Sequence, residues 1–280
     1  MHVTDKHNDT QSHARHHARL ERVLVAALAV VLLYTLLAYL LLPALWTHYE
    51  HQKGLANLPM VTRTAQGIPG DPINIGLIGS EKDVLCSMNA AGWLPADPVT
   101  FKSSIEIAGS VLLDRAYPEA PVSPLYYLGR REDFAFEQPS GRSADRRNHV
   151  RFWKVLDKGQ ENRPVWLGSA TFDKGVGISH FTGAITHHID ADVDAEREHL
   201  ATDLEAAGMV TAKYQVTGVG LTLTGRNGGG DFYYTDGEVW VLRLVEDCHK
   251  QSGGMTTLPS PPATELKDQI MRSITQTLGR

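Results

Sequence analysis

The distribution of apolar residues separates a membrane segment from a mixed domain of helices and strands. Residues Val23 to Leu42 (VLVAALAVVLLYTLLAYLLL) contain no charged residue and no proline. A helix of about 20 residues spans roughly 30 Å, the thickness of the hydrocarbon core of a bilayer. Pro43 follows the run, and Trp46 and Tyr49 lie where aromatic side chains favour the membrane interface. The pattern predicts one transmembrane anchor over residues 23–42 and the lipid bilayer as a partner.

Basic residues are distributed unevenly on the two sides of this segment. The preceding ones are Lys6, Arg15, Arg19 and Arg22, and the following ones are Lys53 and Arg63. Because the flank richer in Lys and Arg stays in the cytoplasm, we expect a cytoplasmic tail over 1–22 and an exported, periplasmic C-terminal part at the inner (plasma) membrane. A cleaved signal peptide is the alternative interpretation. Its apolar region is usually about 7–15 residues long and precedes a small-x-small site, which this chain does not offer.

The pattern after the anchor divides the chain further. Residues 43–70 are polar and punctuated by Gly and Pro, which is typical of a linker, and the main domain is expected over 71–250. The tail over 251–280 begins with flexible sequence. A short helix is expected near its end because Leu266, Ile270, Ile274 and Leu278 recur at every fourth position. Such a stripe needs a surface that buries it, and we expect the domain to provide it.

Within the domain the period of the apolar positions changes twice. A strand over 73–80 and helices over 81–92 and 95–118 come first. Short runs rich in aromatic and β-branched residues follow from Pro121 and predict strands. The clearest helix is Asp194–Gly208, and two more strands follow it. Clustered rather than alternating elements predict an α+β fold with a largely antiparallel sheet.

Composition restricts the function only broadly. The net charge is −5, so no nucleic-acid partner is expected. Two cysteines, Cys86 and Cys248, could pair in an exported domain or remain as two buried thiols.

Two adjacent histidines precede alternating aspartates in the stretch ITHHIDADVDAERE, residues 185–198. In a strand, His187 and His188 point to opposite faces, so they bind one ion only where the strand has ended. In that case His188, Asp190 and Asp192 could converge on a divalent metal. Imidazole and carboxylate ligands suit Zn²⁺, Mn²⁺ or Fe²⁺.

The same stretch has an acid–base interpretation and a structural one. Its candidate catalytic residues are His187, His188, Asp190 and, from the glycine-rich loop GRNGGGD, Asp231. In the structural interpretation, Asp192 or Asp194 caps the following helix, because a carboxylate accepts a bond from a free backbone N–H and complements the helix dipole. Capping accounts for the acids but leaves the paired histidines unexplained.

A second group of candidates is basic. Anion-binding candidates are Arg142, Arg147, His149, Arg151 and, in the glycine-rich loop, Arg226. Arginine binds phosphate or carboxylate with two parallel bonds, which suits a lipid headgroup or a phosphorylated polymer. The period of HVRFWKV places His149, Arg151 and Trp153 on one face of a strand. A solvated hairpin paired with nearby acids is the alternative.

Several blocks together resemble the LssY-like C-terminal domain. They are DPINIGLIGS (71–80), GWLPAD (92–97), APVSPLYYLG (120–129), PVWLGSATFD (164–173), THHIDADVDAERE (186–198) and GRNGGGDFYYTDG (225–237). Members of that family occur as single-span proteins or fused to membrane phosphatases of the type 2 phosphatidic acid phosphatase kind and to DedA-like proteins. The resemblance therefore implies a bacterial cell envelope and phospholipid metabolism, and it assigns no catalytic residue.

Three functions fit these observations. The first is an anchored protein whose exported domain binds an anionic ligand, or a membrane partner such as another envelope membrane protein, without catalysis. The second is a metal-dependent hydrolase, in particular a phosphoesterase, that uses the THHIDAD motif. The third is a structural subunit of a membrane assembly. Convergence of the histidines in a concave pocket would favour an enzyme, whereas an open basic face would favour binding.

Overall fold

We analysed a computed structural model, which describes residues 5–55, 57–96, 124–140, 146–183, 185–216 and 224–277. The chain divides into two compact units, one formed by residues 1–50 with 261–280 and the other by residues 51–260. The expected helix over 95–118 lies mostly outside the described residues.

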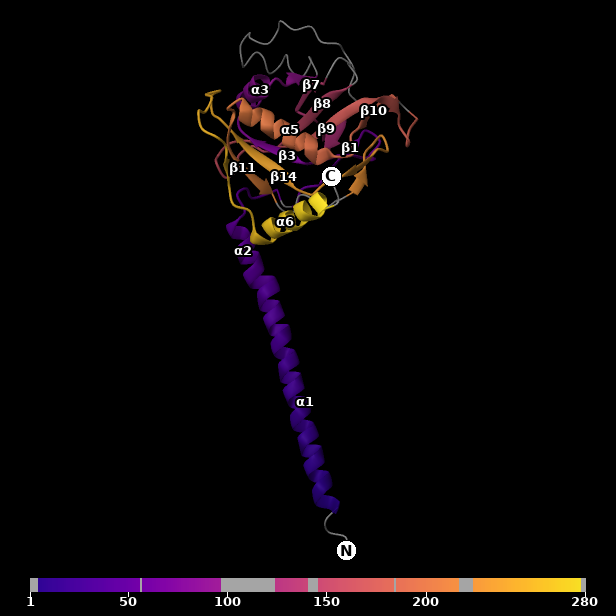
Figure 1. The fold of residues 1–280 in the computed structure, drawn as a ribbon, viewed down its shortest axis with the longest axis vertical. Helices are drawn as coiled ribbons and strands as arrows, with labels where there is room; N and C mark the ends of the chain where they lie inside the picture. The colour runs from indigo at the N-terminus through magenta and orange to yellow at the C-terminus, as the bar shows by residue number, and fades with distance from the viewer. Residues whose placement is uncertain are drawn as a thin grey trace. The chain divides into compact units, whose positions relative to one another are not determined.

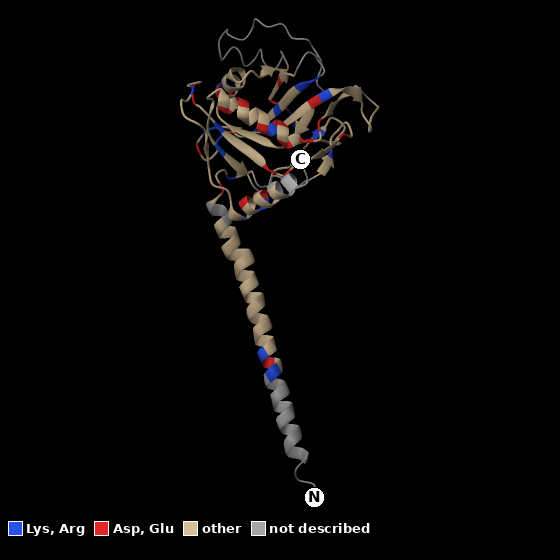
Figure 2. Ribbon diagram, viewed as in Figure 1, with Lys and Arg blue, Asp and Glu red and all other residues tan. Residues whose placement is uncertain are grey.

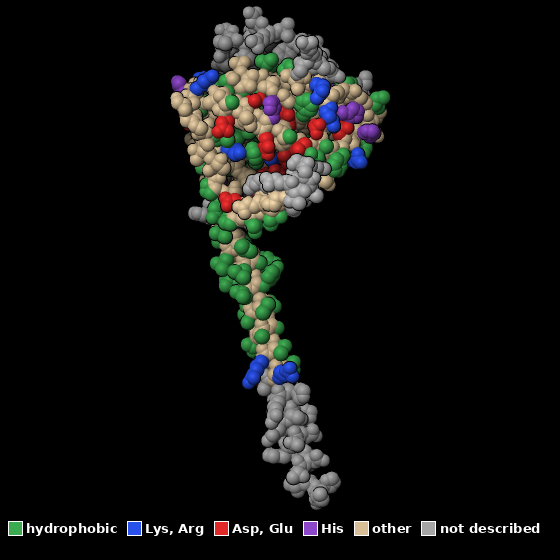
Figure 3. Space-filling model, in the orientation of Figure 1, with side chains coloured by type: hydrophobic (Ala, Val, Ile, Leu, Met, Phe, Trp, Pro, Cys, Tyr) green, Lys and Arg blue, Asp and Glu red, His purple; other side chains and the backbone are tan. Residues whose placement is uncertain are grey.

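The first unit contains the apolar helix. Helix α1 (Asp5–Leu36) continues through a π-helical turn, η1 (Leu37–Leu41), into α2 (Leu42–His48). Arg19–Leu45 is long and apolar enough to cross a membrane, and it is bounded by basic side chains at one end (Figures 2 and 3). The helix does not end at Pro43 as its sequence suggests. Pro43 lacks a backbone N–H, and the wider turn η1 directly precedes it, so the chain remains helical past the proline.

The second unit is built on a nine-stranded sheet. Its order is β15-β11-β14-β3-β9-β8-β7-β4, and β10 also pairs with β9. The strands are β3 (Ile75–Ile78), β4 (Leu94–Pro95), β7 (Phe134–Pro139), β8 (Arg147–Leu156), β9 (Val165–Ile178), β10 (Ile185–Ile189), β11 (Val210–Val216), β14 (Val239–Leu244) and β15 (Thr256–Thr257). Only two of these pairings are parallel, β14 with β3 and β11 with β15. The predicted α+β fold with a largely antiparallel sheet is confirmed.

Two smaller sheets complete the domain. One has the order β2-β1-β5-β6 and the other pairs β12 with β13. These strands are β1 (Val61–Thr64), β2 (Pro69–Pro72), β5 (Leu125–Tyr127), β6 (Arg130–Arg131), β12 (Thr224–Arg226) and β13 (Phe232–Tyr234). Strands β1 and β2 lie in the segment expected to be a linker, so regular structure begins before residue 71. Their sequences, VTRT and PGDP, are too short and polar to show a strand period.

Helices α3 (Glu81–Ala90) and α5 (Val193–Ala206) lie against one face of the large sheet (Figure 1). The main hydrophobic core lies between these helices and the sheet, and it includes Leu77, Val84, Phe152 and Leu200. Ser80 begins α3 in a reciprocal capping arrangement with Asp83. Cys86 of α3 forms a disulfide with Cys248, which follows β14. Of the two alternatives that the sequence left open, the structure has the disulfide.

The opposite face of the sheet is divided into an apolar part and a polar part. Its apolar part is a second core that includes Ile78, Trp153, Leu167 and Val241. Its polar part lies on β7, β8 and β9, where charged side chains are buried instead of exposed. Burying charge is unfavourable unless the groups are paired, so such a face marks a place where function is expected.

Candidate functional site

The polar part begins with the alternation of β8. Arg147, His149 and Arg151 lie on one face of the strand, and all three are buried. Val150 and Phe152 lie on the other face, in the main core. This alternation was predicted from the sequence, but the basic side chains are buried in the domain and do not form an open basic face.

Antiparallel pairing places the polar positions of β9 beside those of β8. The register pairs Arg147 with Asp173, His149 with Thr171, and Arg151 with Ser169. On the other side of β8, Glu137 of β7 pairs with His149. Adjacent residues on one face of a sheet are in contact, so two basic strand positions are matched by two acids.

Arg147 connects these acids. Its Nη1 donates a 2.7 Å hydrogen bond to Oε2 of Glu137, and its Nε donates a 3.1 Å bond to Oδ2 of Asp173. Its Nη2 lies 3.3 Å from Nε2 of His187. Burial raises the pKa of Glu137, an effect that Arg147 opposes. Because its donors are already used by protein groups, Arg147 orders the site and is not available to a ligand.

A cavity of about 230 Å³ lies over this face. Its wall combines parts of the chain that are distant in sequence, namely β2, β8, β9, β10 and the loop after β12. The polar side chains that define its chemistry are Asp71, His149, Arg151, Asp173, His187 and Asn227. A cavity of this size accommodates a small polar group, such as the headgroup of a larger molecule.

Asp71 is the buried acid of the cavity wall. Its Oδ2 accepts a hydrogen bond of 3.4 Å from Nη1 of Arg151, and its Oδ1 accepts one of 3.2 Å from Nδ2 of Asn227. Burial raises the pKa of Asp71, and the negative charge of nearby Asp173 raises it further, while Arg151 opposes the shift. Two carboxyl groups in one cavity therefore differ in environment, which is the usual basis for an acid role and an ionised role.

His149 is the buried imidazole of the same cavity wall. It is 1 % exposed, and its buried Nε2 has no hydrogen-bond partner among the described residues. Burial lowers its pKa well below the ordinary value, and the positive charges of Arg151 and Arg147 lower it further. A histidine held neutral in this way can accept a proton at neutral and mildly acidic pH.

The glycine-rich loop is organised by Asn227. Its Oδ1 accepts hydrogen bonds from the backbone N–H groups of Gly229 and Asp231, and its carbonyl accepts one from Gly230. Backbone N–H groups of a glycine-rich loop can form an anion-binding nest. These three N–H groups instead bind Asn227, which aims its Nδ2 at Asp71 of the cavity. The loop thus contributes the side-chain amide of Asn227 to the site, where it donates a hydrogen bond to Asp71.

The two adjacent histidines have different environments, as expected for a strand. His187 lines the cavity, and its Nδ1 lies 3.7 Å from Oδ2 of Asp173. His188 contacts Asp231 instead, with 2.6 Å between Nδ1 and Oδ1. A hydrogen-bonded chain continues from Asp231 through Asn227 to Asp71, with distances of 3.5 and 3.2 Å. The partly exposed His188 is therefore connected to the buried acid of the cavity.

The aspartates that follow the histidines have structural partners. Asp192 is the N-cap of α5 and accepts a hydrogen bond from the N–H of Ala195. Asp190 accepts a bond from the N–H of Asp192, and its other oxygen lies 3.8 Å from Nζ of Lys174. Within the described part of the chain, no group of three or more His, Cys, Asp or Glu is arranged to hold a metal ion. Asp192 is thus a helix cap, as the capping interpretation expects, while His188 and Asp190 contact other protein groups.

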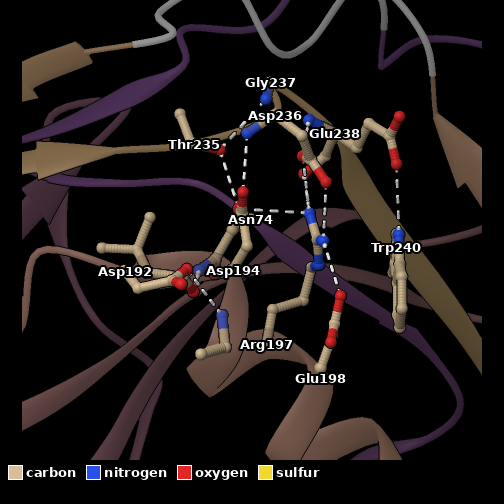
Figure 4. A network of polar contacts seen from close by, with 12 residues as sticks. Asn74, Asp192, Asp194, Arg197, Glu198, Thr235, Asp236, Gly237, Glu238 and Trp240 are labelled. Atoms are coloured by element: carbon tan, nitrogen blue, oxygen red, sulfur yellow. Dashed lines mark hydrogen bonds and ion pairs between the residues drawn. The ribbon is translucent and has the colours of Figure 1, made fainter. Parts of the chain in front are cut away.

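Helix α5 is held by a further polar network (Figure 4). Arg197 is fully buried and donates two hydrogen bonds of 2.8 Å to the carboxylate of Asp236, and its guanidinium lies 4.4 Å from the ring centroid of Trp240. Asp194 accepts bonds from the hydroxyl of Thr235 and the N–H of Asp236. The motifs DADVDAERE and YYTDG thus join α5 to the segment between β13 and β14.

The remaining anion-binding candidates are Arg226 and Arg142. Arg226 is exposed and donates a hydrogen bond to the carbonyl of Gly230 within its own loop. Arg142 lies outside the described residues. Sequence analysis missed Asp71, Asp173 and Asn227. Alternating polar residues in GSATFD of β9 are the signal that could have revealed Asp173, because they match the alternation of β8.

Comparison with known proteins gives one match. A family model described as LssY C-terminus matches residues 55–239, which is more than half of the chain and includes every described residue of the cavity wall. No curated protein and no solved structure matches the chain. The chain belongs to the LssY C-terminal domain family.

Proposed function

We propose that this protein is a membrane-anchored hydrolase whose exported domain uses the cavity for acid–base catalysis on a polar, headgroup-sized ester. The observation that carries the proposal is that a buried imidazole, His149, and a buried carboxyl group, Asp71, lie in the wall of one cavity. Burial shifts their pKa values in opposite directions. The pKa of His149 is lowered and its Nε2 has no hydrogen-bond partner among the described residues, whereas the pKa of Asp71 is raised so that it retains its proton to higher pH. Opposed shifts of this kind are the usual arrangement of a general base and a general acid.

The proposed reaction uses each group once. His149 accepts a proton from water as the water oxygen bonds to the carbonyl carbon or phosphorus of the ester. The bond to the leaving oxygen breaks, and Asp71 donates its proton to that oxygen. Proton exchange with solvent then restores both groups. Arg151, 3.4 Å from Asp71, is placed to stabilise negative charge that develops on the substrate.

The anchor supports the choice of substrate class. A helix able to cross a membrane precedes the domain, and Lys and Arg are more frequent before it. An exported domain on such an anchor meets lipids and envelope polymers first, so we propose an ester from one of these sources. The Cys86–Cys248 disulfide fits an oxidising compartment outside the cytoplasm.

A panel of chromogenic esters tests the proposal. The full chain in detergent would be assayed with phosphomonoesters, phosphodiesters and carboxyl esters, each with and without added divalent metal. We expect hydrolysis of one class, and a loss of at least about 10²-fold in His149→Gln, the usual effect of removing a general base. His199→Gln is the matched control, because its side chain is 41 % exposed and lies outside the cavity. Equal activity in His149→Gln would contradict the assignment.

Binding of an anionic group without catalysis is the second candidate. The observation in its favour is the presence of Arg151 and two histidines in the cavity wall. Against it, Asp173 lines the same cavity, and its negative charge opposes an anion. Calorimetric titration with inorganic phosphate separates the hydrolase from the non-catalytic binding protein. Phosphate binding that is abolished in Arg151→Gln, together with no hydrolysis of any ester, would favour the second candidate.

A further inference from the structure

The C-terminal helix exposes apolar side chains. Helix α6 (Pro262–Thr277) follows the folded domain, and Leu266, Ile270 and Ile274 recur on it at intervals of four residues. Leu266 is 57 % exposed and Ile270 is 51 % exposed. The sequence predicted a short helix whose stripe the domain buries. The helix is present, but these two side chains are not buried, so another surface must cover them if the stripe is to be stable in water.

The opposite side of α6 is the one with reduced exposure. Thr264 is buried and Asp268 is partly buried, and helical geometry places both of them away from Leu266 and Ile270. A helix on a soluble protein normally turns its apolar stripe inward. Leu266 and Ile270 of α6 are exposed instead, as on a helix whose apolar face meets a bilayer.

Chain connectivity brings the start of α6 close to the membrane anchor. The ring Nε2 of His51 donates a hydrogen bond of 2.9 Å to the carbonyl of Pro259. His51 follows the apolar segment Arg19–Leu45 after a few residues, and α6 begins three residues after Pro259. A chain reaches at most about 3.5 Å per residue, and the His51 side chain adds several Å, so the start of α6 lies within roughly 40 Å of the end of the apolar segment. Residues 261–280 also form one compact unit with residues 1–50, separate from the domain.

We propose that α6 is an interfacial helix that lies on the bilayer and inserts Leu266 and Ile270 into the headgroup region. This inference rests on the anchor of the proposed function and is independent of its chemistry. Charges of both signs alternate along the helix, with Glu265, Lys267, Asp268 and Arg272. Because positive and negative charges on the helix balance, we expect it to attach through its apolar side chains without a requirement for anionic lipid. The anchor and α6 then hold the domain at two points, which restricts its orientation above the membrane.

Site-specific fluorescence in nanodiscs tests the inference. The full chain would carry Ile270→Cys, Leu266→Cys or Glu265→Cys, labelled with an environment-sensitive dye, in phosphatidylcholine nanodiscs whose acyl chains are brominated. Both native cysteines are in the disulfide and do not compete for the dye. We expect blue-shifted emission and at least twofold quenching at positions 270 and 266. At position 265, on the polar side, we expect emission typical of water and little quenching.

A label at Leu28→Cys, within the apolar segment, separates failure of the inference from failure of the anchor. Quenching at position 28 with none at 266 and 270 would overturn the interfacial helix and leave the anchor in place. Absence of quenching at all four positions would overturn both. A dehydrated label at 270 without quenching would show that protein covers α6, which also contradicts the inference.

Discussion

Nδ1 of His188 lies 2.6 Å from Oδ1 of Asp231, and Asp231 continues through Asn227 to the buried acid Asp71. The two adjacent histidines therefore have different contacts. His187 lines the cavity directly, while His188 is connected to it through Asp231. A residue that acts through others is a positioning residue, and its removal should change the behaviour of Asp71 without removing the catalytic groups.

Replacing Asp231 with Asn tests this positioning role. The charge of Asp231 contributes to the raised pKa of Asp71, so Asp231→Asn lowers that pKa. The alkaline limb of the activity–pH profile should move to lower pH, and the maximal rate should fall about tenfold, equivalent to ~1.4 kcal/mol. Asp190→Asn is the matched control, because Asp190 lies outside the cavity and contacts Lys174. An unchanged alkaline limb in Asp231→Asn would refute the role.

Replacing Arg197 with Met should destabilise the domain strongly. Arg197 is 0 % exposed and binds Asp236 through two hydrogen bonds, so its loss removes the counter-charge of the partly buried carboxylates of Asp236 and Asp194. Breaking a buried pair costs about 3–5 kcal/mol. Lys82→Met, which breaks an exposed pair with Asp247, should cost less than about 1 kcal/mol. Denaturant unfolding of the full chain in detergent measures both, and equal shifts would contradict the structural role of Arg197.

Glu196 should make the stability depend on pH. Burial raises its pKa to about 8 from the ordinary value, and its Oε1 has no partner among the described residues. The folded state therefore holds a proton that the unfolded state releases, so stability is full at acidic pH and falls as pH rises toward 8. Its contribution falls by about 1.4 kcal/mol per pH unit within that window.

Glu196→Gln removes this contribution because it cannot ionise. Unfolding at pH 5 and pH 7.5 should show the wild-type protein losing stability relative to the variant as pH rises. Parallel profiles for the two proteins would show that Glu196 does not titrate in this range.

Reduction of the disulfide should destabilise the domain. Cys86 and Cys248 are separated by 162 positions, so their bond closes a long loop. Loss of such a bond typically costs about 2–5 kcal/mol. Dithiothreitol should lower the unfolding midpoint of the wild-type protein and leave that of a Cys86→Ser/Cys248→Ser double variant unchanged. A midpoint in the wild type that does not respond to the reductant would contradict this expectation.

Local periodicity in the sequence predicted part of the site. Alternation in HVRFWKV placed His149 and Arg151 on one strand face, and the capping preference of aspartate indicated Asp192 or Asp194 as the N-cap, of which Asp192 is the cap. Both features depend on residues close together in the sequence. The environment of Arg147 does not, because its partners Glu137 and Asp173 lie on neighbouring strands. A cluster that looked like a surface for anions is therefore a set of buried ion pairs.

The cavity itself could not be predicted. Asp71 follows a segment whose polar sequence resembles a linker, and it approaches Arg151 only because β2 belongs to a small sheet packed near β9. Asn227 lies in a loop whose composition is equally typical of any long hairpin. Long-range pairing decides which polar residues share a cavity, and a single sequence does not contain that information.

The most direct test of the account is the pH dependence of ester hydrolysis by the full chain. We predict that the rate is maintained as pH falls through the ordinary histidine range, because burial lowers the pKa of His149 well below it, and that the rate declines as pH rises through the raised pKa of Asp71. The Asp71→Asn variant should lose most of the activity, and its remaining activity should not show that decline. A rate that falls with the ordinary histidine pKa of about 6.5, or that is unaffected by His149→Gln, would contradict the account.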